Sequence, residues 1–204
     1  MTEEAILYLT RTDKILANLI QRVGPCTLIP KNGRSPFESL VRSVVYQQLN
    51  GIAAATILAR VRALFPGRRF PRPQDFLSTS DVLLRGAGLS RAKTAAIKDI
   101  SAKTLAGIVP TARSIAQMTN EEILARLTTL RGVGPWTVEM LLIFTLGRPD
   151  VLPVTDYGVR KGFARAYRRK ALPEPKELLK FSERWKPHRT TAAWYFWRAL
   201  ELPE

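Results

Sequence analysis

The sequence predicts an all-α protein. Apolar residues recur at helical spacing along most of the chain, strand-like alternation is nearly absent, and capping residues, Gly and Pro fall where helices should start and stop. We expect roughly ten short helices joined by loops of about two to eight residues. The one Pro- and Arg-rich connection, residues 65–76, is predicted to be a surface loop. With 204 residues, 46% of them hydrophobic, the chain can fill the core of one compact unit or of two small lobes.

Capping signals mark the starts of two helices. Ser35 and Glu38 form the pattern of a capping box around Pro36, which suits the first helical position, and Thr119 with Glu122 repeats the pattern. The expected helical segments are "DKILANLIQRVG", "SPFESLVRSVVYQQLN", "GIAAATILARVRALF", "STSDVLLRGA", "SRAKTAAIKDISAKTLAG", "TNEEILARLTTL", "PWTVEMLLIFTLG", "TDYGVRKGFARAYRRKA", "PKELLKFSERW" and "RTTAAWYFWRALEL".

The charge balance indicates a polyanionic partner. Thirty-two Lys and Arg against 17 Asp and Glu give a formal net charge of +15, which is typical of proteins that bind nucleic acid, although charge for solubility alone is the alternative. The basic residues are spread along the chain, which argues against a membrane anchor. Two segments concentrate them, and some of these side chains are expected to contact a DNA backbone. They are Arg91, Lys93, Lys98 and Lys103, and Arg160, Lys161, Arg165, Arg168 and Arg169.

Cysteine and histidine are each present once, as Cys26 and His188. An internal disulfide, a four-cysteine zinc or iron–sulfur site and a metal site built from two histidines are therefore excluded. Cys26 is expected to be a small buried residue. The N-terminus has no signal-peptide pattern and no apolar run reaches the roughly 18 residues of a membrane span. We expect a cytoplasmic protein, associated with the nucleoid if it is bacterial.

The stretch "LTTLRGVGPWTVEMLLIF" contains a break in what is otherwise a helical pattern. Gly132, Val133, Gly134 and Pro135 interrupt it. A turn between two helices exposes main-chain N–H groups and the positive end of the second helix, and glycines let an anion approach them without a Cβ in the way. In so basic a chain the natural anion is a nucleic-acid phosphate. A simple turn between helices is the alternative.

The spacing of "LRGVGPWT" resembles the helix-hairpin-helix motif, in which a Gly-hydrophobic-Gly turn binds DNA phosphate. That motif also occurs in binding modules without catalytic activity, so it does not by itself predict an enzyme.

A carboxylate follows this turn in "DVLPVTDYGVRKGF". Asp156 lies at the expected start of a helix, where an aspartate is often only a cap. The functional alternative is a fixed, ionised carboxylate that stabilises positive charge on a deoxyribose as its base departs, and that orients or deprotonates the attacking water. The residues alone leave both alternatives open.

Together, these segments resemble the helix-hairpin-helix (HhH-GPD) DNA glycosylase superfamily, and within it the 3-methyladenine DNA glycosylase II (AlkA-like) family. The resemblance covers nearly the whole chain and implies Asp156 as the catalytic residue and Arg131 to Pro135 as the phosphate-binding hairpin, with Arg131, Gly132, Val133 and Gly134 at the phosphate. It is carried by "ILANLIQRVGPCTL", "PFESLVRSVVYQQL", "GLSRAKTAAIKDIS", "LRGVGPWTVEMLLIF", "VLPVTDYGVRKGF" and "WKPHRTTAAWYFWRAL".

One position distinguishes branches of that superfamily. Bifunctional members, which also cut the DNA backbone, have a nucleophilic lysine two residues after the second hairpin glycine, where this chain has Trp136. An indole cannot form a Schiff base, so the resemblance implies a monofunctional enzyme that uses water. The absence of four cysteines likewise argues against the iron–sulfur branches.

The resemblance also implies a base pocket and a wedge. Trp136 and Trp197 would line the pocket and attract cationic bases through their electron-rich faces, while Met140 stands where the best-known bacterial member has an aromatic residue. At least two of the four tryptophans are expected in the core. Gln48 or Leu49 would fill the gap that a flipped nucleotide leaves, unless Leu49 simply packs under its turn.

The family also implies two helical lobes with the active cleft between them. One lobe would span about residues 33–131 and the other about 1–32 plus 136–204, joined by the hairpin at 131–135. The predicted function is a monofunctional glycosylase that hydrolyses alkylated bases from double-stranded DNA as a monomer, with no cofactor, although a monovalent cation at the hairpin carbonyls is compatible. The alternative is a non-catalytic DNA-binding protein. The lesion range stays open among 3-methyladenine, 7-methylguanine, ethenoadenine, hypoxanthine, 1-methyladenine and 3-methylcytosine.

Overall fold

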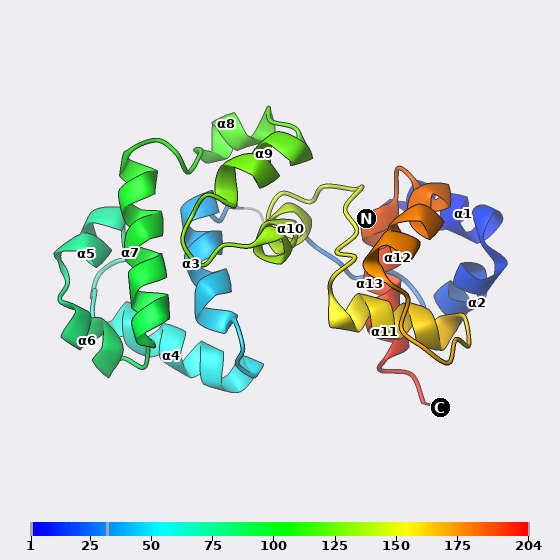
Figure 1. The fold of residues 1–204 in the computed structure, drawn as a ribbon, viewed down its shortest axis with the longest axis horizontal. Coiled ribbons are helices and arrows are strands. Elements are labelled where there is room, and N and C mark those ends of the chain that lie inside the picture. Colours follow the sequence, from blue (N-terminus) through cyan, green and yellow to red (C-terminus); the bar gives the residue numbers. More distant parts are fainter. Residues whose placement is uncertain (1, 32, 204) are drawn as a thin grey trace. The chain divides into compact units, whose positions relative to one another are not determined.

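The computed structural model describes residues 2–31 and 33–203 and confirms the all-α prediction, since these residues form helices and no strand (Figure 1). The described residues form fourteen helices, against the roughly ten predicted. The helices are α1 (Glu3–Thr12), α2 (Lys14–Val23), α3 (Pro36–Tyr46), α4 (Gly51–Ala63), α5 (Pro73–Ser78), α6 (Asp81–Gly86), α7 (Arg91–Leu105), α8 (Ala112–Ala116), α9 (Asn120–Leu127), α10 (Pro135–Phe144), α11 (Tyr157–Ala166), α12 (Pro175–Phe181), the 3-10 helix η1 (Ser182–Trp185) and α13 (Arg189–Ala199). No helix in the described part of the chain is long and apolar enough to cross a bilayer.

The chain divides into two compact units. Unit 1 combines Met1–Lys31 with Leu142–Glu204, and unit 2 is Asn32–Leu141. The boundary falls inside α10 and not at its start, so the hairpin and the first seven residues of α10 belong to unit 2. Trp136 and Met140 are therefore grouped with the hairpin.

Unit 2 is built around α3 and α7, which pack against each other. Both helices bury β-branched and leucine side chains on their shared side, among them Leu40 and Val44 of α3 and Ile97 and Ile100 of α7. Helix α5 packs on α7 as well. This core holds the C-terminal end of α3 and the hairpin before α10 on neighbouring parts of one scaffold.

The surface loop predicted over residues 65–76 is only partly observed. Helix α5 begins at Pro73, and Phe76 is fully buried, with its ring centroid 6.1 Å from that of Phe37 and 5.6 Å from that of Phe65. The prediction is wrong for the end of this segment because its aromatic residues complete the core of unit 2. The Pro and Arg residues between these aromatic residues gave the segment the composition of a surface loop.

Unit 1 is built around α13, which packs on α11 and α2. Its core is aromatic: Phe163, Trp185 and Phe196 are buried and lie edge-on or tilted to one another. Trp194 is also buried, so the prediction that at least two of the four tryptophans are core residues is confirmed by Trp185 and Trp194. This core fixes α11, whose first turn follows Asp156.

A buried carboxylate ties the N-terminal helices to that aromatic core. Asp13 caps α2 by accepting hydrogen bonds from the main-chain N–H groups of Ile15 and Leu16, and its second oxygen accepts from the Tyr167 hydroxyl at 2.5 Å and from the Trp185 indole N–H at 3.1 Å. Burial, followed by the hydrogen bond to Asp13, raises the pKa of Tyr167 far above its ordinary value. Asp13 thus accepts hydrogen bonds from four donors, which lie in α2, in η1 and just after α11.

The capping predictions are confirmed in one case and half confirmed in the other. Thr119 and Glu122 form a complete capping box at α9. Ser35 accepts from the N–H of Glu38 as predicted, but the Glu38 carboxylate bonds to Arg42 at 2.8 Å and does not return to the cap. The carboxylate forms an ion pair with Arg42, one helical turn later, in place of the bond that would complete the capping box.

Candidate functional site

The shape of the hairpin before α10 is fixed by the conformation and the contacts of its main chain. Gly132 has φ +74°, which L side chains rarely adopt, and a Cβ there would lie 3.0 Å from the Ala96 side chain of α7. The Val133 side chain is buried, and its N–H donates to Leu130 O at 3.2 Å. The N–H of Arg131 donates to the Asp99 carboxylate at 2.8 Å. The turn therefore has one shape, and α7 supports it.

Pro135 is the first residue of α10, as predicted. The carbonyl of Gly134 accepts from the N–H groups of Thr137 and Val138, which makes Gly134 the residue before the helix. Gly132 and Gly134 are exposed, and a Cβ on Gly134 would meet no atom within 4 Å. Glycine at 134 therefore leaves open space in front of the helix start, as an approaching anion requires.

Gln47 is a site residue that the sequence did not reveal. Its side-chain amide donates to Gly132 O at 3.0 Å and to the Thr137 hydroxyl at 3.2 Å. It thereby ties the end of α3 to the hairpin and to the first turn of α10. The only signal in the sequence was its place beside the predicted wedge, since the partner lies 85 residues away.

Lys93 belongs to the basic segments in which some DNA contacts were predicted, but its ammonium group is bonded within unit 2. Its ammonium group donates to Val45 O and to Gln47 O, each at 2.8 Å. Burial lowers the pKa of Lys93. The two carbonyls lie at the C-terminal end of α3, where a cation is favourable. Lys93 therefore supports the turn that carries the predicted wedge.

The predicted wedge residues lie on that turn. Gln48 has φ +56°, an uncommon conformation for a residue with a side chain, and it is exposed. Leu49 is 39% exposed, so it is not packed under the turn as the simpler alternative required. Both side chains are available to a ligand, and the structure does not favour one over the other.

Several other residues of the two predicted basic segments also have partners within the protein. Lys98 pairs with Asp81 and Lys103 with Asp99. Arg169 pairs with Glu177, and Arg160 and Arg165 donate to main-chain carbonyls. The net charge of the chain thus overstates the number of cations available to a ligand. Arg91 and Arg168 are exposed and make no ion pair with the described part of the chain.

Asp156 is the N-cap of α11, so the capping interpretation is confirmed. Its Oδ1 accepts the main-chain N–H of Val159 at 2.8 Å. The same oxygen accepts the indole N–H of Trp197 at 2.9 Å. The carboxylate is half-buried. Two donors on one oxygen fix the plane of the group, which a cap alone does not require.

Trp197 comes from the last part of α13 and stacks on Phe144, with ring centroids 5.6 Å apart and planes at 25°. The structure therefore brings Asp156 together with Trp197 in unit 1. Trp136, 38% exposed, and Met140, partly exposed, lie on the unit 2 part of α10 with the hairpin. The predicted site residues thus form two groups, one in each unit.

Helix α13 also holds the segment that leads to Asp156. At its start, Arg189 makes two parallel hydrogen bonds to Asp150, at 2.7 and 2.8 Å. The Thr190 hydroxyl donates to Arg148 O at 2.7 Å and accepts from the N–H of Val151 at 2.9 Å. One helix thus binds residues 148–151 at its beginning and the Asp156 carboxylate near its end.

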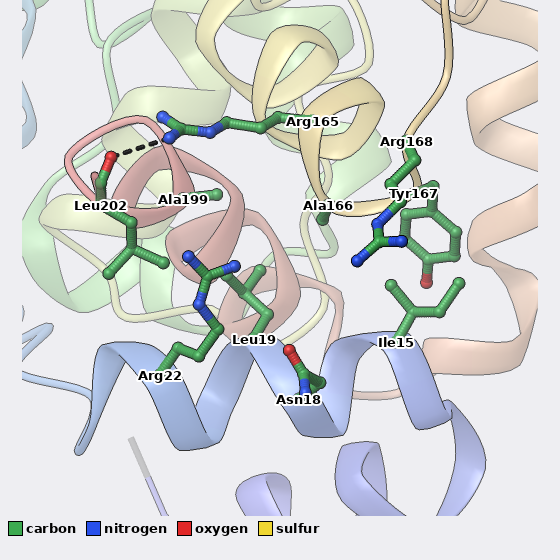
Figure 2. A pocket seen from close by; sticks show the side chains of 10 residues that line it. All are labelled: Ile15, Asn18, Leu19, Arg22, Arg165, Ala166, Tyr167, Arg168, Ala199 and Leu202. Carbon is green, nitrogen blue, oxygen red and sulfur yellow. Dashed lines mark hydrogen bonds between the residues drawn. The ribbon is translucent and has the colours of Figure 1, made fainter. Parts of the chain in front are cut away.

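Unit 1 contains a separate cavity of about 390 Å³ that does not include Asp156 (Figure 2). Figure 2 shows three arginine side chains around it, Arg22 from α2, Arg165 from α11 and Arg168 just after α11, with Arg165 bonded to Leu202 O. The cavity lies at the C-terminal end of α11, whereas Asp156 caps the N-terminal end, roughly 15 Å away along the helix axis. It contains no carboxylate and is not part of the candidate catalytic site.

Metal ligands are not gathered anywhere in the described residues, since no group of three or more His, Cys, Asp or Glu side chains is positioned to hold an ion. At the hairpin, Gly132 O already accepts the Gln47 amide. A monovalent cation there would share Gly132 O with this amide, because a carbonyl oxygen has two lone pairs.

Comparison with known proteins gives concordant results. A model of the HhH-GPD superfamily of base excision DNA repair proteins matches residues 41–188. DNA-3-methyladenine glycosylase 1 of Schizosaccharomyces pombe is 36% identical over 204 residues, covering 98% of this chain and 89% of that protein.

Two solved structures extend the likeness to the fold. A Schizosaccharomyces pombe 3-methyladenine DNA glycosylase in complex with abasic DNA superposes with a TM-score of 0.88 at 36% identity, covering 98% of this chain and 97% of that one. A DNA-3-methyladenine glycosidase from Bacillus halodurans gives 0.85 at 32% identity, covering 97% and 89%.

Proposed function

The chain belongs to the HhH-GPD superfamily of base excision DNA repair proteins, and on that premise we propose that it is a monofunctional DNA glycosylase that removes alkylated bases from double-stranded DNA. The observation that carries the proposal is the Asp156 carboxylate, fixed at a helix start by two N–H donors to one oxygen. The names of the relatives support 3-methyladenine as a substrate, and 7-methylguanine is proposed beside it.

In the proposed reaction the C1′–N bond of an extruded nucleotide breaks and its electron pair leaves with the base. Positive charge develops on the deoxyribose, and the Asp156 carboxylate stabilises it. Water then bonds to C1′ and gives up a proton, for which Asp156 is the acceptor at hand. The products are the free base and an abasic site. None of these steps requires a metal or an organic cofactor.

The other site residues receive roles within the same proposal. The hairpin from Arg131 to Gly134 would bind a DNA phosphate through the main-chain N–H groups of its two glycines, because those of Arg131 and Val133 already donate within the protein. Gln48 or Leu49 would fill the gap in the duplex. Trp136, Met140 and Trp197 would contact the extruded base. Because the Trp197 N–H is bonded to Asp156, this indole would meet the nucleotide with its ring and not with its donor.

Absence of strand cleavage is also part of the proposal. A Schiff base needs an amine at the reacting carbon, and the position that carries a lysine in bifunctional relatives is Trp136. Borohydride treatment during turnover is therefore expected to trap no covalent protein–DNA adduct. A trapped adduct that is lost on replacing one lysine would contradict this part of the proposal.

The test is release of free 3-methyladenine from methylated duplex DNA under single-turnover conditions, comparing wild type with Asp156→Asn. Asparagine caps helices as well as aspartate does, so folding and DNA binding should survive the change. The rate of release should fall about 100-fold or more, because the charge that stabilises the sugar cation is gone.

Asp81→Asn is the matched control, since Asp81 is an exposed aspartate whose ion-pair partner is Lys98. It should release base at the wild-type rate. Equal rates of release for wild type and Asp156→Asn would reject Asp156 as the catalytic carboxylate. DNA binding without any base release would instead favour the non-catalytic binding protein.

A further inference from the structure

Helices α11 and α13 approach unusually closely at two glycines one turn apart. At Gly162 a Cβ would lie 1.9 Å from the main-chain oxygen of Phe196, a distance that no side chain can occupy. Main-chain atoms cannot rotate away as a side chain can. Glycine at this position therefore sets how near the two helices lie, at the residue just before Trp197.

The second glycine lies beside the hydrogen bond of the candidate catalytic group. At Gly158 a Cβ would lie 2.9 Å from Cδ1 and 3.2 Å from Nε1 of Trp197, and 3.1 Å from Oδ1 of Asp156. It would thus contact both the donor and the acceptor of the 2.9 Å indole–carboxylate bond. The indole cannot yield freely because it is stacked on Phe144.

We propose that Gly158 is a positioning residue: by leaving this space empty, it lets the Trp197 indole donate to Asp156 and so fixes the direction of the carboxylate. The inference rests on the proposed function in one respect, since it takes Asp156 to be the catalytic group. Gly162 supports Gly158 by holding the two helices at the required separation.

The physical reason is the arrangement of donors on the carboxylate. The Val159 N–H holds Oδ1 from the direction of the first turn of α11. The indole N–H adds a second direction and fixes the plane. Displacement of a reacting group by about 1 Å costs about 100-fold in rate, so a small rotation is enough to matter.

The first measurement is the indole N–H resonance of Trp197 in tryptophan-labelled protein. The chain has four tryptophans, and Trp197→Phe assigns the signal by removing it. In Gly158→Ala the signal should move upfield and its hydrogen exchange should quicken about tenfold to a hundredfold, the factor for losing a hydrogen bond to a charged group. An unchanged Trp197 signal in Gly158→Ala would overturn the proposal.

Two controls separate positioning from packing. Gly86→Ala adds the same methyl group to a helical glycine with no atom within 4 Å, and it should change neither the signal nor the rate. Ala193→Gly removes a buried methyl group from α13 and weakens that helix without entering the space at Gly158. It should lower the melting temperature but leave the Trp197 signal in place.

The second measurement is single-turnover base release at saturating protein, with affinity for abasic duplex measured separately. Gly158→Ala and Trp197→Phe should each slow release about 10- to 100-fold and leave DNA affinity within about twofold of wild type. In Gly158→Ala the slowing should be the same for 3-methyladenine and 7-methylguanine, because Gly158 acts through the carboxylate and not through the base.

The possible failures are distinguishable. Release at the wild-type rate in Gly158→Ala, despite a moved indole signal, would overturn the positioning role. If wild type releases no base, the proposed function fails, while the indole signal still decides whether Gly158 sets the indole–carboxylate contact. If Gly158→Ala does not fold, Trp197→Phe tests the same bond, and a wild-type rate in that variant would overturn the proposal.

Discussion

The hairpin of unit 2 and the carboxylate site of unit 1 are built in different ways. In the hairpin the exposed groups belong to the main chain around Gly132, and side chains such as Gln47 hold that main chain in place. In unit 1 the candidate catalytic group is a half-buried side chain, Asp156, held by another side chain 41 residues away. A main-chain site should tolerate most side-chain changes but no added Cβ, whereas a side-chain site should fail when one partner is lost.

The largest expected effect comes from the side-chain network of unit 1, at Asp13. Asp13→Ala removes the α2 cap and leaves the buried Tyr167 hydroxyl and Trp185 N–H without their acceptor. We expect the free energy of unfolding to fall by about 3 kcal/mol, the sum of a lost cap and of two unsatisfied buried donors. Urea unfolding followed by tryptophan fluorescence measures it.

Asp81→Asn provides the comparison for Asp13. Asp81 is an exposed aspartate of unit 2 in an ion pair with Lys98, and its loss should cost less than about 1 kcal/mol. If the two variants lose equal stability, the side chains of unit 1 are not the more sensitive set, and the contrast between the units fails.

The next effect tests the main-chain hairpin. Gly132→Ala forces a side chain into a left-handed conformation, which costs about 1–2 kcal/mol, and brings its Cβ to 3.0 Å from Ala96. We expect both a loss of stability and an affinity for duplex DNA lower by about tenfold or more, because the N–H groups of the turn move. Fluorescence anisotropy with a labelled abasic duplex measures the affinity.

Gly107→Ala is a close control for this change, because Gly107 has the same φ of +74° but no atom within 4 Å of its Cβ position. It should carry the same backbone cost with unchanged DNA affinity. Similar affinities for the two variants would show that the shape of the hairpin is not what binds DNA.

The hairpin and the carboxylate site also differ in how far the sequence predicts them. The turn, the first residue of α10 and the capping position of Asp156 follow from local rules, because Gly, Pro and Asp act on their own backbone. Most helices follow from apolar periodicity in the same way. The residues that specify these features stand within a few positions of one another.

The contacts that complete each site could not be predicted in this way. Gln47 reaches the hairpin, Trp197 reaches Asp156, and Lys93 reaches carbonyls at the end of α3, all across more than 40 residues. The sequence does not distinguish a basic side chain that faces solvent from one that binds the carbonyls at the end of a helix. The aromatic residues of 65–76 were concealed for the same reason, since burial depends on the whole core.

A smaller effect separates two neighbouring glutamines of unit 2. Gln47→Ala removes the amide donor to Gly132 O and Thr137, and should cost about 1 kcal/mol of stability and several-fold in DNA affinity. Gln48→Gly should not reduce stability, because glycine adopts φ +56° readily.

The same variant also tests the wedge. If Gln48 is the wedge, Gln48→Gly slows base release, and if Leu49 is the wedge, only Leu49→Ala slows it. A stability loss at Gln48 larger than at Gln47 would contradict these assignments.

The smallest effect concerns pH and again lies in the side chains of unit 1. Burial, with the nearby Cys26, raises the pKa of Tyr195 to about 12, and its hydroxyl donates to Gly24 O. The unfolded chain ionises this phenol near pH 10, so its contribution to stability is complete below pH 10 and is lost as pH rises through about 12. The free energy of unfolding should therefore decline more steeply from pH 10 to 12 in wild type than in Tyr195→Phe, in which other titrating groups are unchanged. Parallel declines in urea unfolding would mean that the folded protein does not hold this phenol in its protonated form.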